Sequence, residues 1–347
     1  MTVGTSARVS VVIPAFNAAE FLPQVLESVF RQTHPPLEVI VVDDGSTDGT
    51  PKVMQCYCDR VNYIRQENGG LSNARNRGIM CARADWIAFL DADDLCLPQR
   101  LEHQLALAER TQADLIFSDA VVVATSEALH HWSAPSWLAQ TGSKEQLQKA
   151  VREEVLPNPF QHLMRIGSFI LPSTVLVRRE CLLDGGLFDE SLQSTQDFEL
   201  WCRLAAKHRF AFHSAPLVIR QVHGQNMTAN QLETLRDSVK AWEKIEKLEI
   251  VRKRRVWRKL VQKKKSHRYW EQGYYFFERN QPAAARASWA KGLRISFSAL
   301  MAAYWTVTLL PERWVIGLRS VVRRIKRWRA SGAAKGGTRL LPKRDDE

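Results

Sequence analysis

Short, mostly apolar runs alternate along the first part of the chain with segments in which apolar residues recur every three or four positions. The runs are typical of buried strands covered on both faces: residues 9–13, 37–42, 86–90 and 114–117. Helical spacing occurs between them, over residues 18–32, 50–58, 74–84 and 101–110. This alternation predicts a parallel sheet flanked by helices.

The pattern weakens after residue 117. Residues 118–165 show little periodicity apart from a predicted helix at 144–155, and we interpret them as an insertion near the substrate cleft. Beyond them the spacing predicts a strand, a helix and two late strands, at 169–177, 197–206, 210–212 and 218–222.

Polar residues gather where the predicted strands end. Asp91 and Asp93 follow the run at 86–90, and their spacing of two aims both carboxylates the same way. Such a pair repels unless a cation lies between the two groups, and hard oxygen ligands suit Mg²⁺ or Mn²⁺. The alternative is an Asp-rich turn that caps the helix starting near Pro98.

A second polar segment, residues 43–49, follows the second strand with carboxylates, hydroxyls and glycines. Ligands bind at this edge in open α/β sheets. Neither G-x-G-x-x-G nor G-x-x-x-x-G-K-[ST] occurs in the chain, so a dinucleotide fingerprint and a P-loop are not supported. Phosphate groups would therefore need a metal ion instead of a glycine cradle.

Five motifs in order resemble the family 2 inverting glycosyltransferases of GT-A fold. They cover about the first two-thirds of the chain and do not reach its tail: residues 9–17 (VSVVIPAFN), 41–49 (VVDDGSTDG), 68–78 (NGGLSNARNRG), 89–94 (FLDADD) and 196–203 (QDFELWCR). The resemblance implies an α/β, Rossmann-like, mostly parallel sheet flanked by helices, here followed by a helical basic C-terminal region. It also implies a nucleotide-diphosphate-sugar donor.

The resemblance implies a divalent metal, Mn²⁺ or Mg²⁺, on the diphosphate. Asp93 is then the leading ligand, and Asp91 contributes directly or through water. Alternatively, Asp91 or the backbone of Ala92 holds the ribose. His223 matches a position that completes the metal site or touches the diphosphate, although a lone histidine is usually structural.

The nucleoside is expected among residues of the first three motifs. Asp44 matches the position that accepts from the base, while Asp43 is expected to orient the loop. Two residues, Pro14 and Phe16, match positions that wall the nucleoside, with turn and core packing as the alternative. Asn73 and Arg75 follow two glycines that let backbone approach the nucleotide. Arg75 is expected to pair with a phosphate or with Asp44, or else to be a surface charge at a helix start.

Asp197 is the expected general base. An inverting transfer is a single displacement, which needs a carboxylate to take the proton of the acceptor hydroxyl. Relatives commonly carry Glu-Asp at this point, whereas this chain has Gln196-Asp197. A helix N-cap is the alternative role for Asp197.

Other residues are candidates for the acceptor side. Asp184, Gly185, Gly186 and Asp189 are candidates for shaping the acceptor pocket. Three tryptophans are candidates for stacking on a sugar, with core packing favoured for the last because of its helical spacing: Trp132, Trp137 and Trp201.

Charge divides the chain unevenly. The net charge of +12 is the sum of −6 over residues 1–230 and +18 over residues 231–347. The first part reads as the catalytic domain, residues 231–329 as a basic amphipathic helical region, and residues 330–347 as a disordered tail. The six cysteines have no framework spacing and are expected to be reduced.

The basic region is expected to meet an anionic membrane surface. Uncharged residues 295–310 are too few to span a bilayer. A soluble helical hairpin, a solvated charged face and nucleic-acid binding are the alternatives, and no DNA-binding signature supports the last, so no nucleic-acid partner is expected. Because the start of the chain reads as a strand and not as a signal peptide, we expect a cytoplasmic protein associated peripherally with the inner face of the membrane.

These features predict a metal-dependent inverting glycosyltransferase. It would move a sugar, from a UDP-sugar above other donors, to a hydroxyl of a saccharide or lipid-linked acceptor in cell-envelope polysaccharide synthesis. The alternative is a catalytically silent nucleotide-sugar-binding assembly protein, for which Gln196 leaves room.

Overall fold

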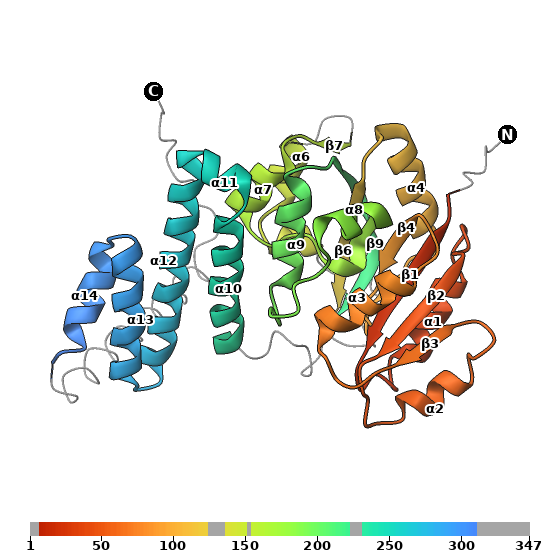
Figure 1. Cartoon of the computed structure of the whole chain (residues 1–347), viewed down its shortest axis with the longest axis horizontal. Coiled ribbons are helices and arrows are strands. Elements are labelled where there is room, and N and C mark those ends of the chain that lie inside the picture. Colours follow the sequence, from red (N-terminus) through yellow and green to blue (C-terminus); the bar gives the residue numbers. More distant parts are fainter. Residues whose placement is uncertain (1–6, 124–135, 151–153, 223–230, 311–347) are drawn as a thin grey trace, which may run out of the picture. The chain divides into compact units, whose positions relative to one another are not determined.

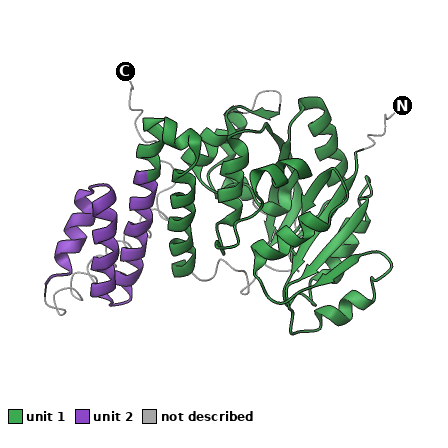
Figure 2. Ribbon diagram, in the orientation of Figure 1, with its two compact units in different colours: residues 1–261 green, residues 262–347 purple. Residues whose placement is uncertain are grey.

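The computed structural model describes residues 7–123, 136–150, 154–222 and 231–310 (Figure 1). The chain divides into two compact units, Met1–Val261 and Gln262–Glu347 (Figure 2). Some earlier predictions concern residues outside the described ranges: the roles of Trp132 and His223, the part of the basic helical region beyond residue 310, and the disordered tail at 330–347.

The first unit is built on one mixed sheet of nine strands in the order β3-β2-β1-β4-β8-β6-β9-β5, with β7 paired to β9. β1 to β4 are mutually parallel where they pair, β9 runs parallel to β6, and β8 is antiparallel to both β4 and β6. The strands are Val9–Ala15, Glu38–Asp43, Asn62–Arg65, Trp86–Phe89, Leu95–Cys96, Leu115–Val123, Val155–Leu156, Val175–Arg178 and Phe210–Gln221. The predicted α/β class is confirmed.

The two faces of the sheet carry different helices because alternate strand residues point to opposite sides. Val9, Val11 and Ile13 of β1 share one core cluster with buried residues of α1 (Leu22–Phe30), α2 (Thr50–Gln55) and α4 (Arg100–Thr111). Val12 belongs to a second cluster with α3, α7, α8 and α9, which span Leu71–Cys81, Pro159–Ile166, Arg179–Gly185 and Gln196–Ala205. The layers are therefore helix, sheet and helix (Figure 1).

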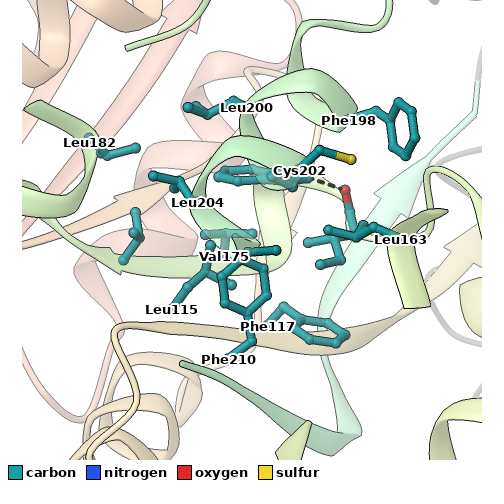
Figure 3. Close-up of a cluster of buried hydrophobic side chains, with 14 of the residues drawn as sticks. Leu115, Phe117, Leu163, Val175, Leu182, Phe198, Leu200, Cys202, Leu204 and Phe210 are labelled. Carbon is teal, nitrogen blue, oxygen red and sulfur yellow. Dashed lines mark hydrogen bonds between the residues drawn. The ribbon is translucent and has the colours of Figure 1, made fainter. Parts of the chain in front are cut away.

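The second cluster forms the larger core. Figure 3 shows Phe117, Val175 and Phe210 of the sheet beneath Phe198 and Leu204 of α9. Trp201 of the same helix is fully buried and donates through Nε1 to the carbonyl of Ile170 at 3.3 Å. Helix α9 is thereby anchored on the sheet, which confirms core packing for Trp201.

Three predicted segments differ from the structure. Residues 118–165 include β6, which runs to Val123, as well as α5 (Trp137–Gln140), α6 (Lys144–Ala150), β7 and α7. The two late strands are one strand, β9, which pairs with β6 across register shifts at Ser118 to Ala120. The predicted strand at 169–177 is reduced to β8, preceded by a 3-10 turn at Pro172–Thr174 in which proline lacks the N–H of a sheet ladder.

The first unit extends well past the expected boundary at residue 230. Trp242 of α10 (Gln231–Glu246) is buried and packs edge-on against Phe198 of α9 at 5.1 Å between ring centroids. Val251 of α11 (Glu249–Lys253) and Trp257 at the start of α12 (Arg255–Glu278) belong to the same core cluster. The acidic-to-basic change in the sequence therefore does not coincide with the division between compact units.

The second unit contains the remainder of α12, then α13 (Pro282–Ile295) and α14 (Ala299–Val307). An aromatic cluster holds these helices together: Trp289 is fully buried and stacks on Trp270 at 5.7 Å, and Tyr304 meets both rings edge-on. None of the helices in the described parts of the chain is both long enough and apolar enough to cross a bilayer. All six cysteines are free thiols, as expected.

Candidate active site

A cleft of about 480 Å³ opens at the carboxyl ends of the parallel strands β1, β2 and β4. Its walls combine polar, charged and apolar side chains from five of the predicted motifs, together with residues of β9. The lining includes Pro14, Phe16, Asp44, Arg75, Asp91, Ala92, Asp93, Asp94, Gln196, Asp197, Arg220 and Gln221. The structure therefore brings most of the predicted site residues to one place.

Three carboxylates crowd the loop after β4. Asp91 and Asp93 line the cleft and are partly exposed, while Asp94 is buried and accepts a hydrogen bond from the backbone N–H of Gln221 at 3.2 Å. Burial, together with the charges of Asp93 and Asp91, raises the pKa of Asp94 well above its ordinary value. A group of oxygen ligands with this much negative charge fits a hard divalent cation such as Mg²⁺ or Mn²⁺.

Arg75 is the cation nearest to this loop. Its side chain is only 2% exposed, and Nη2 donates to Asp91 Oδ1 at 2.6 Å. The expected pair with Asp44 is therefore wrong, because the guanidinium is directed toward the end of β4. Nε and Nη1 of Arg75 are buried and have no hydrogen-bond partner among the described residues, so these donors remain available in the wall of the cleft.

Asp44 organises the loop that precedes α3. Its carboxylate accepts from the backbone N–H groups of Gly69 and Gly70, both at 2.8 Å, and from the side chain of Gln66 at 2.8 Å. Gly70 has a φ of +88°, which L side chains rarely adopt. Oδ2 accepts only one of these three bonds, from Gly70, so the carboxylate retains a lone pair for a further donor.

Asp43 is fully buried and holds the loop after β2. It accepts from the backbone N–H of Ser46 at 2.8 Å and from the hydroxyl of Tyr63 at 2.5 Å. Burial and the neighbouring carboxylate raise the pKa of Tyr63, so that its proton stays in place as the donor to Asp43. Asp44 therefore lines the cleft, while the buried Asp43 holds the loop after β2 in place.

Of the remaining nucleotide-site candidates, Pro14, Phe16 and Ala92 line the cleft, and the side chain of Phe16 is 51% exposed. Asn73 is not part of the lining. Its amide donates to Glu190 at 3.0 Å and its oxygen accepts from Gln66 at 2.6 Å. Asn73 therefore ties α3 to the turn before α9 and supports the loop that Asp44 organises.

Asp197 lies in the first turn of α9 and is partly buried. The N-cap of this helix is Thr195, so the capping role considered for Asp197 is not what the structure shows. Loss of hydration raises the pKa of Asp197 to about 6, even though the N–H of Phe198, at 2.7 Å from Oδ1, and the charge of Arg75 oppose the rise. Such a carboxyl is poised to exchange a proton near neutral pH.

A residue that the sequence did not single out positions the start of α9. Oδ2 of the buried Asp237, on α10, accepts from the backbone N–H groups of Gln193, Ser194 and Thr195 at 3.1, 2.9 and 3.0 Å. Its distance of about forty positions from Asp197 in the chain hides this contact from local pattern analysis. Gln196, the residue before Asp197, is 4% exposed, and its Oε1 has no hydrogen-bond partner among the described residues.

The acceptor-side candidates do not line the cleft. Asp189 pairs with Lys244 of α10, and Asp184, Gly185 and Gly186 also lie outside the lining. Trp137 donates through Nε1 to the carbonyl of Phe169 at 2.9 Å. Asp189 and Trp137 therefore have structural contacts in the described part of the chain.

The helix–sheet–helix layers and the carboxylate-lined cleft at the ends of β1, β2 and β4 define a protein of the GT-A type. The chain is similar to glycosyltransferase family 2 over nearly half of its length. The model of that family, described as "Glycosyl transferase family 2", matches residues 10–168. An uncharacterized glycosyltransferase of Rickettsia typhi is 29% identical over 237 residues, which are 68% of this chain and 71% of that relative.

Solved structures share the fold. TarS from S. aureus in complex with UDP-GlcNAc aligns with a TM-score of 0.61 at 17% identity, over 86% of this chain and 83% of TarS. The mannosyltransferase PcManGT from Pyrobaculum calidifontis, in complex with GDP-Man and Mn²⁺, aligns with a TM-score of 0.53 at 17% identity, over 90% of this chain and 86% of that one. At these identities the likeness establishes the fold alone.

Proposed function

We propose that this glycosyltransferase catalyses an inverting transfer of a sugar from a UDP-sugar to a hydroxyl of a saccharide or lipid-linked saccharide. The observation that carries the proposal is that Asp91, Asp93, Arg75 and Asp197 line one cleft. The fold shared with a protein solved with UDP-GlcNAc supports the choice of donor. The transfer would then need one group to take the acceptor proton and others to receive the leaving diphosphate.

Asp197 would act as the general base. With a pKa of about 6 it is ionised at neutral pH and basic enough to take a proton from the acceptor hydroxyl as the glycosidic bond forms. The charge of Arg75 stabilises its ionised form. The neighbouring Gln196 cannot take this role because an amide does not ionise.

Asp93 and Asp91 would hold Mn²⁺ or Mg²⁺. When bound, such an ion neutralises the charge that develops on the diphosphate. Arg75 fixes the orientation of Asp91 through their 2.6 Å ion pair, and its free Nε and Nη1 donors suit a phosphate oxygen. His223 remains a candidate third ligand. The backbone of Ala92 remains a candidate contact for the ribose.

The nucleoside would lie over the ends of β1 and β2. Asp44 Oδ2 is suited to accept an N–H from the base, because it accepts one hydrogen bond, from Gly70, and keeps a further lone pair. Pro14 and the exposed ring of Phe16 would wall the nucleoside. Asn73 would act indirectly by holding this loop.

An anionic membrane surface is the proposed partner of the second unit. The enzyme would then lie in the cytoplasm, at the inner face of the membrane. Ile295–Leu310 contains no charge, and Phe297, Leu300 and Leu309 are more than half exposed. Lys263–Lys265 of α12 supply positive charge in the same unit. An exposed apolar face with basic residues nearby fits the interface of an anionic bilayer, where envelope polysaccharide acceptors would be held.

Donor turnover separates the proposal from a catalytically silent nucleotide-sugar binder. We expect purified protein with Mn²⁺ to release UDP from one member of a UDP-sugar panel, and Asp197→Asn to bind UDP normally while losing turnover. Asp59→Asn, an exposed carboxylate on the surface, is the matched control. Binding of UDP and Mn²⁺ without turnover by the wild type for any donor and acceptor hydroxyl would instead support the silent protein.

Co-sedimentation tests the membrane partner. The full chain should pellet with phosphatidylglycerol vesicles and not with phosphatidylcholine vesicles, and Phe297→Ser with Leu300→Ser should weaken this binding. Tighter binding to RNA than to anionic vesicles at equal salt would contradict the proposal.

A further inference from the structure

A second group of metal-ligating side chains lies away from the cleft. Asp114 precedes β6, Cys181 lies in α8, and His208 follows α9, and one ligand atom from each falls within 4.8 Å of the others. The register pairs Trp86 with Arg178 at the amino end of β4, whereas Asp91 follows its carboxyl end. The group is therefore at the edge of the sheet opposite the cleft.

The two separations from His208 match those of a tetrahedral metal site, and Cys181 and Asp114 lie within 4.8 Å of each other. His208 Nδ1 lies 3.5 Å from Cys181 Sγ and 3.6 Å from Asp114 Oδ2. Zinc bonds of ordinary length at tetrahedral angles give an S···N separation of about 3.6 Å and an N···O separation of about 3.4 Å. The distance to Asp114 is too long for a hydrogen bond, so a hydrogen-bonded network accounts for only one of the two contacts.

The backbone fixes the ligands in place. The N–H of Asp114 donates to the carbonyl of Arg209, and its carbonyl accepts from the N–H of Arg178, both at 2.9 Å. Asp114 Oδ2 also accepts from the N–H of Arg209 at 3.1 Å, while Oδ1 lies 3.6 Å from the guanidinium of Arg178. The carboxylate is thus oriented with Oδ2 toward His208. No rearrangement of the sheet is required for ligation.

A cation has both access and a favourable charge environment. Side chains of His208 and Asp114 are 21% and 27% exposed, so the site is open on one side. Acidic residues Glu180 and Asp184 add negative charge near Cys181, which Arg178 opposes. A thiol nucleophile is a poor alternative reading, because Cys181 is only 3% exposed and burial raises its pKa to about 12.

We propose that Asp114, Cys181 and His208 form a zinc site that clamps the turn after α9, with water as the fourth ligand. Binding releases the thiol proton of Cys181 to solvent as the Zn–S bond forms, and neither zinc nor sulfur changes oxidation state. Because the site lies at the far edge of the sheet, the ion contacts no substrate. Its effect is to stabilise the helix that carries Asp197 at its other end.

Cobalt substitution distinguishes this site from the cleft. Co²⁺ bound through a thiolate produces a sulfur-to-metal charge-transfer band in the near ultraviolet, whereas the carboxylates Asp91 and Asp93 produce none. Full-length, chelator-stripped protein should develop this band with about one equivalent of Co²⁺, and Zn²⁺ should abolish it. Zinc should also raise Tm in the absence of any nucleotide.

Two variants and one control complete the test. Cys181→Ser should abolish the band, and His208→Gln should weaken zinc binding by about 100-fold or more in competition with a chromophoric chelator. Cys202→Ser, which removes another buried thiol, should retain both properties. If stripped wild-type protein gives no sulfur band, or if zinc binding and the zinc-dependent rise in Tm are the same in Cys181→Ser, the site is not a metal site. UDP-sugar turnover with Mn²⁺ is measured separately, so either proposal can fail alone.

Discussion

The pH dependence of turnover should report the ionisation of Asp197. Burial raises its pKa from 3.8 to about 6. With that pKa, about nine-tenths of the protein carries the carboxylate at pH 7 and about one-tenth at pH 5. If the carboxylate takes the acceptor proton, kcat should fall roughly tenfold between these values. An ordinary aspartate would leave kcat almost unchanged over the same range.

The assay is the initial rate of UDP release at saturating donor, acceptor and Mn²⁺ between pH 5 and pH 8. Binding of UDP with Mn²⁺ is measured over the same range, because protonation at Asp91 or Asp93 would otherwise imitate the loss. Asp59→Asn should reproduce the wild-type profile. A flat profile, or wild-type turnover in Asp197→Asn, would refute the assignment of the base.

The same shift has a consequence for stability. A carboxyl whose folded-state pKa is raised destabilises the fold above that pKa and has no such effect below its unfolded pKa. For Asp197 the shift from 3.8 to about 6 corresponds to about 3 kcal/mol at most. Asp197→Asn should therefore increase the free energy of unfolding in urea at pH 7, and the gain should shrink as the pH falls toward 4. A less stable variant at pH 7 would show that the carboxylate is favourably solvated in the fold.

Three further predictions concern residues that support the cleft and the metal ion proposed to bind in it. Asp237→Asn weakens three backbone hydrogen bonds and should lower the free energy of unfolding in urea by roughly 1–3 kcal/mol, with the exposed Asp184→Asn as the control. In Gly78→Ala the new Cβ would lie 2.4 Å from Val12 Cγ1, so α3 could not keep its place on β1. The free energy of unfolding in urea should fall by roughly 1–3 kcal/mol, and an unchanged stability would contradict the close packing. Removal of divalent metal with a chelator should abolish UDP release, and Mn²⁺ alone, without Zn²⁺, should restore it; turnover that persists after stripping would exclude a metal at Asp93.

The sheet and the part of the cleft at Asp44 and Asp91 were largely predictable because their signals are local. A buried parallel strand is apolar at nearly every position, and β1, β2 and β4 lie within about two residues of the predicted runs. Polar residues directly after such strands meet at one edge, which is why Asp44, Asp91 and Pro14 were expected together.

Contacts across the sequence were not predictable in this way. Arg75 was expected to pair with a phosphate or with Asp44, yet it pairs with Asp91, sixteen positions further along the chain. The choice between the two carboxylates depends on where α3 lies over β4, and no local pattern encodes that position. For the same reason no local pattern indicated Asp237, whose partners lie more than forty positions away.

The predicted boundary between the two parts of the chain was wrong for a different reason. The boundary at residue 230 was predicted from the difference in net charge between the two parts of the chain, but the core continues through Trp242 and Val251. Surface charge reports what a segment meets in solution, while the extent of a compact unit depends on which apolar residues are buried together. Helix α10 carries charges of both signs and packs an apolar face on α9, so its place in the compact unit could not be judged from charge.

The segment that carries Asp197 is held in place by residues outside the matched family region. That region, residues 10–168, contains Asp44, Arg75 and Asp93 but ends before α9. The start of α9 is held by Asp237, and its outer face packs against Trp242. Because both residues belong to α10, a helix beyond the predicted boundary at residue 230 supports the segment that carries Asp197, the proposed general base. Asp44, Arg75 and Asp93 thus lie in the matched region, while Asp197 and its support lie outside it.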